Sequence, residues 1–176
     1  FHVSARTVST HALNIFGDHS DVMACRQTGF AMLCEGNVQE VMDLSPVAHL
    51  AALSGKVPFI NFFDGFRTSH EIQKIAVWDY KDLADMCDMD AVKAFREHAL
   101  NPEHPAMRGS HENGDTFFQH REACNQYYDA LPEVVEKYMG KINEKLGTDY
   151  KLFNYYGAPD ADRVIIAMGS ICDVAE

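Results

Sequence analysis

Short apolar runs separated by polar stretches dominate the first part of the chain. Residues 1–5, 28–34 and 58–63 are short and apolar enough to be β-strands, and the last run has five apolar or proline residues in six positions. An almost continuous apolar run of this length is typical of a strand that is covered on both faces in a parallel sheet. The pattern therefore predicts three strands, the last of them fully buried.

A helix is predicted between the second and third strands. Asn37 is a suitable N-cap, Glu40 follows three residues later, apolar positions then recur at helical spacing, and Gly55 closes the segment. Pro46 is costly inside a helix, so the pattern allows either a kink there or a start near Ser45. Strand, helix and strand with short joints form the βαβ unit of a parallel sheet, which predicts an α/β fold.

The other predicted elements are mostly helical. A turn at 16–27 leads into one or two helical turns, and an acidic helix or helix pair is predicted at 79–100. A loop follows at 101–115, and then a helical stretch at 121–146 that breaks or begins near Pro132 and ends at Gly147. A buried strand is predicted at 163–170. The loop is longer than most connections in compact domains, which indicates a functional, interfacial or mobile segment.

A polar cluster directly follows the third strand. Its members are Asp64, Arg67, Thr68, Ser69, His70 and Glu71. Ligands bind at the carboxyl ends of strands in open α/β sheets, so a functional site is one interpretation. The interpretation favoured by the residues alone is a helix start, in which Thr68 or Ser69 is the cap and Glu71 lies in the first turn.

Composition and charge exclude several classes of protein. The five cysteines are scattered and form no CxxC pair, so we expect a reducing cytoplasm and neither a disulfide framework nor a zinc or iron–sulfur site. No segment has the pattern of a signal peptide or a membrane span. The net charge is −11, and only seven of the 26 acidic residues lie in residues 1–75. This charge argues against nucleic acid and anionic membranes as partners.

The motifs give little support for a metal site or for a catalytic nucleophile. The candidate metal ligands are AspHisSerAsp at 18–21 and a second group of Glu103, His104, His111 and Glu112. Neither group has the spacing of a common metal site, and turn or loop chemistry is the simpler explanation. Ser69, His70 and Asp64 supply the residue types of a nucleophilic triad, but adjacent Ser and His side chains on a helix point in different directions. Glycine-rich phosphate motifs are absent.

Arg6 is the one isolated cation at a predicted strand end. A guanidinium group in that position suits bidentate capture of a carboxylate substrate. From the residues alone, an internal salt bridge is the more ordinary explanation.

A set of ordered motifs gives a family resemblance. PheHisValSerAlaArg (1–6) and PhePheAspGlyPheArgThrSerHisGluIleGlnLysIle (62–75) are the most distinctive, and further motifs lie at 15–32, 38–43, 47–51, 101–105, 151–153 and 157–170. Together they resemble pyruvate:ferredoxin (flavodoxin) oxidoreductase over essentially the whole chain. The start at Phe1, without methionine and directly in apolar sequence, agrees with an internal segment of a larger protein.

The resemblance implies an architecture and an activity. Residues 1–150 would be the C-terminal part of a three-layer, pyrimidine-side thiamine-diphosphate-binding domain with a largely parallel sheet, and 151–176 would begin a transketolase-C-like domain with its first strand. The full enzyme would oxidise and decarboxylate pyruvate to acetyl-CoA with thiamine diphosphate, Mg and [4Fe–4S] clusters, pass electrons to ferredoxin or flavodoxin, and form a homodimer in the cytoplasm. The 176 residues alone would bind no cofactor and be inactive.

The resemblance also assigns site residues. Arg6 closes the motif whose arginine holds the pyruvate carboxylate in the family, which overturns the salt-bridge explanation. We expect Ile15, Asp18 and His19 to line the rim of the pocket beside Arg6. Asp64, Arg67 and His70 are expected to fix packing between domains or subunits. No catalytic or metal-binding residue is expected within the chain.

Two alternatives remain open from the sequence. The chain could be the equivalent segment of another 2-oxoacid:ferredoxin oxidoreductase, with a different pocket for the acyl group. It could also be a non-catalytic acidic α/β module that binds a basic partner.

Overall fold

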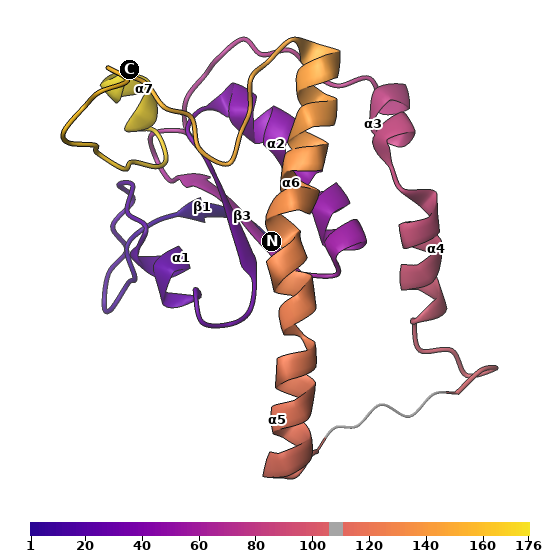
Figure 1. Ribbon diagram of the computed structural model, residues 1–176. Coiled ribbons are helices and arrows are strands. Elements are labelled where there is room, and N and C mark those ends of the chain that lie inside the picture. The colour runs from indigo at the N-terminus through magenta and orange to yellow at the C-terminus, as the bar shows by residue number, and fades with distance from the viewer. Residues whose placement is uncertain (106–110) are drawn as a thin grey trace.

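The computed structural model describes residues 1–105 and 111–176, and its centre is a three-stranded parallel sheet (Figure 1). The strands are β1 (His2–Ala5), β2 (Ala31–Glu35) and β3 (Phe59–Asp64), in the order β1-β3-β2. His2 pairs with Asn61 and Ala31 pairs with Phe59. The three predicted strands and their parallel arrangement are therefore confirmed, and all three carboxyl ends lie at one edge of the sheet.

Helices cover both faces of this sheet. The helices of the described residues are α1 (Ser20–Ala24), α2 (Val38–Gly55), α3 (Tyr80–Met86), α4 (Met89–Glu97), α5 (Gly114–Ala123), α6 (Asn125–Leu146) and α7 (Cys172–Ala175). On one face, Val22 of α1 packs with Ala5, Ile60 and Phe62. On the other face, α2 lies between the sheet and the long helix α6 (Figure 1). This layered α/β arrangement is the fold class that the sequence predicts.

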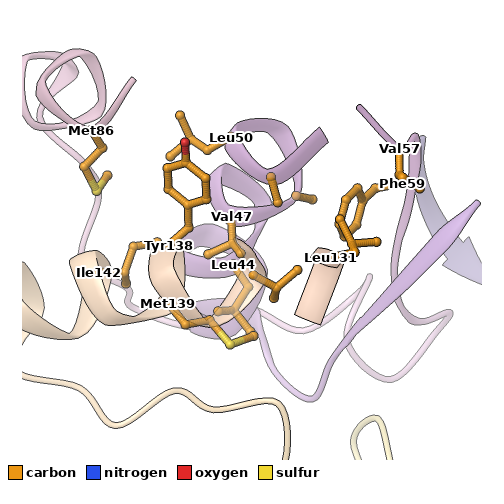
Figure 2. Close-up of a cluster of buried hydrophobic side chains, with 13 residues drawn as sticks. Leu44, Val47, Leu50, Val57, Phe59, Met86, Leu131, Tyr138, Met139 and Ile142 are labelled. Atoms are coloured by element: carbon orange, nitrogen blue, oxygen red, sulfur yellow. The ribbon is translucent and has the colours of Figure 1, made fainter. Parts of the chain in front are cut away.

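The main core lies between α2 and α6. Figure 2 shows side chains of α6 directed toward those of α2, and the buried residues on the two helices include Leu44, Val47, Leu50, Tyr138 and Ile142. Phe59 of β3 and Met86 of α3 complete the same cluster. A continuous apolar core of this kind is the main source of stability for the sheet and its neighbouring helix.

Helix α2 runs through Pro46 without a break. Its first turn has the predicted cap, because the Asn37 side chain accepts a hydrogen bond from the Glu40 amide at 2.9 Å. Pro46 has no N–H group, so the carbonyl of Met42 has no helical donor. The indole Nε1 of Trp78 donates to that carbonyl at 3.2 Å instead. A donor from outside the helix thus compensates for the proline, and the later start near Ser45 is not found.

The helical region after residue 110 starts earlier than predicted. Helices α5 and α6 together span 114–146, and Pro132 lies inside α6. Gly147 ends α6 as predicted, with a left-handed φ of 71° that favours glycine. Residues 106–110 of the predicted loop lie outside the described residues. None of the described helices has the length and apolar character needed to cross a membrane.

Two sequence predictions are wrong in this structure. The polar cluster after β3 does not begin a helix: residues 65–70 form turns, and Phe66 has a left-handed φ of 64° that interrupts helical geometry. The predicted strand at 163–170 is also not formed, and Ile165 and Ile166 are 92% and 87% exposed. A strand needs a hydrogen-bonded neighbour, and this segment has none among the described residues.

Candidate functional site

The carboxyl edge of the sheet brings the ends of β1 and β3 together. Arg6 directly follows β1, and Gly65 directly follows β3, with the Gly65 amide donating to the Ala5 carbonyl at 2.8 Å. The backbone of Arg6 is held from a second side, because its amide donates to Asp21 Oδ2 at 2.8 Å. Arg6 also forms an isolated antiparallel bridge with Gly17. Three contacts therefore fix the backbone from which the Arg6 side chain starts.

The guanidinium group of Arg6 forms no ion pair with any residue in 1–105 or 111–176. Its Nε atom is buried and has no hydrogen-bond partner in the same part of the chain. A buried donor without a partner costs free energy, so such a group in a folded protein calls for an explanation. Among the described residues, the salt bridge that the residue types alone suggest for Arg6 is thus not formed.

An open pocket of about 710 Å³ lies at the same edge of the sheet. Its walls come from the loop after β1, the start of α1, the loop after β3 and the segment before α7. The polar lining residues include Asp18, His19, Asp64, Arg67 and Ser170. The apolar ones are Phe16, Met23, Phe66, Met168, Ile171 and Val174. Arg6 and Ile15 are not among the lining residues, and Ile15 is 43% exposed.

Asp64 connects three segments of this pocket. Its Oδ1 contacts His19 Nε2, and its Oδ2 accepts a hydrogen bond from the Ser170 amide at 2.7 Å. Burial opposes ionisation of the carboxyl group, but the hydrogen bonds from Ser170 and His19 outweigh it and hold the pKa of Asp64 below its usual value. Asp64 is therefore ionised at neutral pH and holds the His19 ring on the pocket wall. The sequence analysis did not foresee that Asp64 and His19 lie in one pocket.

The remaining predicted residues are Asp18, Arg67 and His70, and all three are exposed. Asp18 accepts a 2.6 Å hydrogen bond from the Ser20 amide, and the hydrogen bonds to Ser20 lower the pKa of Asp18. Arg67 is exposed and its amide donates to the Gly65 carbonyl at 2.8 Å. His70 is exposed, its Nδ1 lies 2.8 Å from Ser69 Oγ, and its ring is 5.8 Å from that of Phe66. The role of His70 in packing between domains or subunits stays a prediction.

Glu35 is a feature of the structure that the sequence analysis missed. It ends β2, its side chain is fully buried, and neither carboxyl oxygen has a hydrogen-bond partner among the described residues. Burial and the nearby carboxylate of Glu40 raise the pKa of Glu35 to about 9. Glu35 is therefore protonated at neutral pH. The signal that could have revealed it is an acidic residue at the end of an apolar strand.

The two candidate metal motifs do not assemble a metal site. Among the described residues, no group of three or more histidine, cysteine, aspartate or glutamate side chains could hold a metal ion. In the second motif, Glu112 instead lies against His120 of α5.

The fold and the pocket together indicate the class of protein. The chain contains a parallel α/β sheet whose carboxyl edge carries an open pocket and an arginine without a partner among the described residues, at the edge where ligands bind in open α/β enzymes. Residues 1–140 match the family described as pyruvate flavodoxin/ferredoxin oxidoreductase, thiamine diphosphate-binding. The chain belongs to this family.

Individual relatives agree with this membership. The chain is 63% identical over all 176 residues to the pyruvate-flavodoxin oxidoreductase of Enterobacter agglomerans, and 61% identical to the pyruvate:ferredoxin oxidoreductase of Moorella thermoacetica. It is 50% identical over 170 residues to a protein of Cryptosporidium parvum named pyruvate dehydrogenase [NADP(+)]. The chain spans 15% of the length of the first two relatives and 9% of the third.

Proposed function

We propose that the chain is the substrate-binding part of an enzyme that oxidatively decarboxylates pyruvate to acetyl-CoA and CO₂ and reduces ferredoxin or flavodoxin. The observation that carries the proposal is the unpaired guanidinium of Arg6 at the carboxyl edge of the sheet, in a chain that is similar over its full length to pyruvate oxidoreductases. In this proposal the parent enzyme is a cytoplasmic homodimer that also binds CoA.

The relatives support a role on the pyruvate side of the reaction. The Enterobacter and Moorella proteins are named for flavodoxin and ferredoxin, whereas the Cryptosporidium protein is named for NADP⁺. The chain keeps at least 50% identity to all three. What their names share is pyruvate, so this segment is expected to serve the common substrate and the electron acceptor is expected to bind elsewhere.

Arg6 would hold the pyruvate carboxylate. A planar guanidinium donates two parallel hydrogen bonds to a carboxylate, and this geometry fixes the direction in which the neighbouring ketone points. The Arg6 Nε is buried and has no partner among the described residues, so the hydrogen bonds to such a ligand would come from the terminal Nη atoms of the guanidinium. Its contribution is orientation and charge neutralisation, while the covalent chemistry belongs to thiamine diphosphate.

The described residues fit the substrate carboxylate better than they fit the cofactor. They present no group of metal-ligating side chains, and the phosphate-binding glycine motifs are absent from the sequence. The groups that hold the diphosphate, its Mg ion and the [4Fe–4S] clusters are therefore expected in other parts of the parent enzyme. By the same argument, we expect the 176 residues alone to show no pyruvate-dependent reduction of a redox dye.

The test is Arg6→Ala in the full-length enzyme. Loss of a charge-assisted contact to a carboxylate is expected to raise the pyruvate KM by about 10- to 100-fold, with the CoA KM unchanged. Because the contact to the carboxylate is made in the bound substrate as well as during attack on the ketone, its loss is expected to act mainly on KM, so kcat should change less than KM. Arg121→Ala, which removes an exposed arginine on α5, is the matched control. An unchanged pyruvate KM in Arg6→Ala would remove Arg6 from the site.

The alternative within enzymes is another 2-oxoacid as substrate. A larger acyl group would keep the carboxylate contact and change only the pocket around it. Comparing kcat/KM for pyruvate and 2-oxobutyrate in the full-length enzyme separates the two, and a preference for the longer acid would favour the alternative.

A further inference from the structure

Gly65 lies where a side chain would collide with Arg6. A Cβ atom added at Gly65 would be 2.5 Å from both the Ala5 carbonyl oxygen and Arg6 Cγ, and 2.8 Å from Arg6 Nε. Cβ atoms essentially never approach other heavy atoms closer than 3.0 Å. Any residue other than glycine at this position therefore forces a displacement.

Backbone conformation does not explain the glycine. Gly65 is not among the glycines with positive φ, which are Gly29, Gly147, Gly157 and Gly169. Any residue can therefore adopt its φ angle without the penalty that reserves the left-handed region for glycine. The requirement for glycine at position 65 comes from the space that the Ala5 carbonyl oxygen and the Arg6 side chain occupy.

The surrounding contacts determine which atoms would move. The Arg6 backbone is held by its amide hydrogen bond to Asp21, and Gly65 is joined to Ala5 by a 2.8 Å amide hydrogen bond. The Ala5 carbonyl oxygen belongs to the backbone that these contacts hold, so the flexible part of the contact is the Arg6 side chain. Its Cγ and Nε atoms would have to rotate away from β3.

We propose that Gly65 is a positioning residue: by leaving the space beside β3 empty, it sets the direction in which the Arg6 guanidinium reaches its anionic ligand. This inference rests on the proposed function of Arg6 in binding the pyruvate carboxylate. Gly65 itself contacts no reacting atom. Its role is to fix the approach of another side chain, the one that binds the substrate carboxylate.

Gly65→Ala in the full-length enzyme tests the proposal. We expect the pyruvate KM to rise by about tenfold or more and kcat to change by less than about threefold, because the displaced guanidinium acts on substrate binding. The dissociation constant of oxamate, an unreactive isostere of pyruvate, measured by calorimetry, should rise in parallel. Gly140→Ala is the control, since a Cβ there meets no atom within 4 Å.

A double-mutant cycle separates positioning from general damage. If Gly65 acts through Arg6, adding Gly65→Ala to Arg6→Ala should leave the pyruvate KM and the oxamate affinity at their Arg6→Ala values. The collision with the Ala5 carbonyl persists in the double variant, so any purely structural effect would persist with it. Independent, additive effects of the two substitutions would overturn the proposal.

The outcomes also separate this inference from the proposed function. If Arg6→Ala raises the pyruvate KM and Gly65→Ala does not, the role of Gly65 is rejected and that of Arg6 stands. If neither substitution changes the pyruvate KM, the proposed function of Arg6 fails. If Gly65→Ala prevents folding of the parent enzyme, recovery of folding in the Arg6→Ala background would support the contact with the Arg6 side chain, and loss of folding in both backgrounds would assign the collision to the Ala5 carbonyl and reject positioning.

Discussion

Glu35 is a buried acid at the end of β2, so its charge state affects the stability of the sheet. Its pKa is raised from 4.5 to about 9 by burial and by the Glu40 carboxylate. Between these two values the folded protein holds a proton that the unfolded chain has released. Stability contributed by protonated Glu35 is therefore fully present below about pH 4.5 and falls as the pH rises toward about 9.

Glu35→Gln should remove this pH dependence. The amide is neutral at every pH and nearly the same size, so the variant should gain thermal stability relative to the parent protein as the pH is raised from about 5 to about 8.5. Each pH unit in the window changes the free energy of unfolding by at most about 1.4 kcal/mol. Melting temperatures at the two pH values give the measurement, and Glu97→Gln, at an exposed position on α4, is the control. Equal pH dependence in parent and variant would show that Glu35 is ionised in the folded protein.

At the scale of the helix, Trp78 compensates for the hydrogen bond that Pro46 removes from α2. The proline leaves the Met42 carbonyl without its helical donor, and the Trp78 indole replaces that donor at 3.2 Å. Trp78→Phe keeps much of the packing against the core but removes the N–H group. The expected cost is about 1 kcal/mol in the free energy of unfolding, measured by urea denaturation.

The proline itself supplies the control. In a Pro46→Ala background the backbone N–H of residue 46 can reach the Met42 carbonyl, so Trp78→Phe should cost clearly less than in the parent protein. The same cost in both backgrounds would mean that Trp78 contributes through packing alone.

Helix α2 and its flanking strands were predicted correctly because their signals are local in the sequence. Asn37 and Glu40 form a cap that depends only on residues close in sequence, and the strands flanking α2 are recognisable from their apolar runs. Local pattern could not reveal the turn after β3, because Thr68 and Ser69 have the residue types of a helix cap. In the structure the Ser69 hydroxyl accepts from the Phe66 amide, and the left-handed Phe66 stops the helix.

The candidate site was predicted unevenly for a related physical reason. Arg6 can be placed at a strand end from its neighbours in sequence, but its lack of a partner is a property of the folded sheet edge. The contact between His19 and Asp64 joins residues 45 positions apart. The close approach of Arg6 to Gly65, which leaves no room for a Cβ atom, depends on β1 and β3 being neighbours. Single-residue propensities contain no information about contacts between residues that are distant in sequence.

At the scale of the whole molecule, the segment 163–168 is the largest mismatch between sequence and structure. Val164, Ile165 and Ile166 have the composition of a buried strand, yet they are 62%, 92% and 87% exposed. Three consecutive exposed β-branched residues are unfavourable in water. Since the chain spans 15% of the length of the Enterobacter relative, residues elsewhere in the parent enzyme are expected to cover this segment.

The replacement of Ile165 and Ile166 by serine should therefore have opposite effects in two contexts. In the 176-residue chain it removes exposed apolar surface, so the soluble yield should rise and binding of the dye ANS should fall. In the full-length enzyme it would remove two buried side chains, and the melting temperature and soluble yield should fall because each buried isoleucine contributes about 2 kcal/mol or more. Lys93→Ser, at an exposed position on α4, should change neither protein. A gain in solubility in both contexts would mean that the segment stays exposed in the complete enzyme and that 163–168 is not a strand of a second domain.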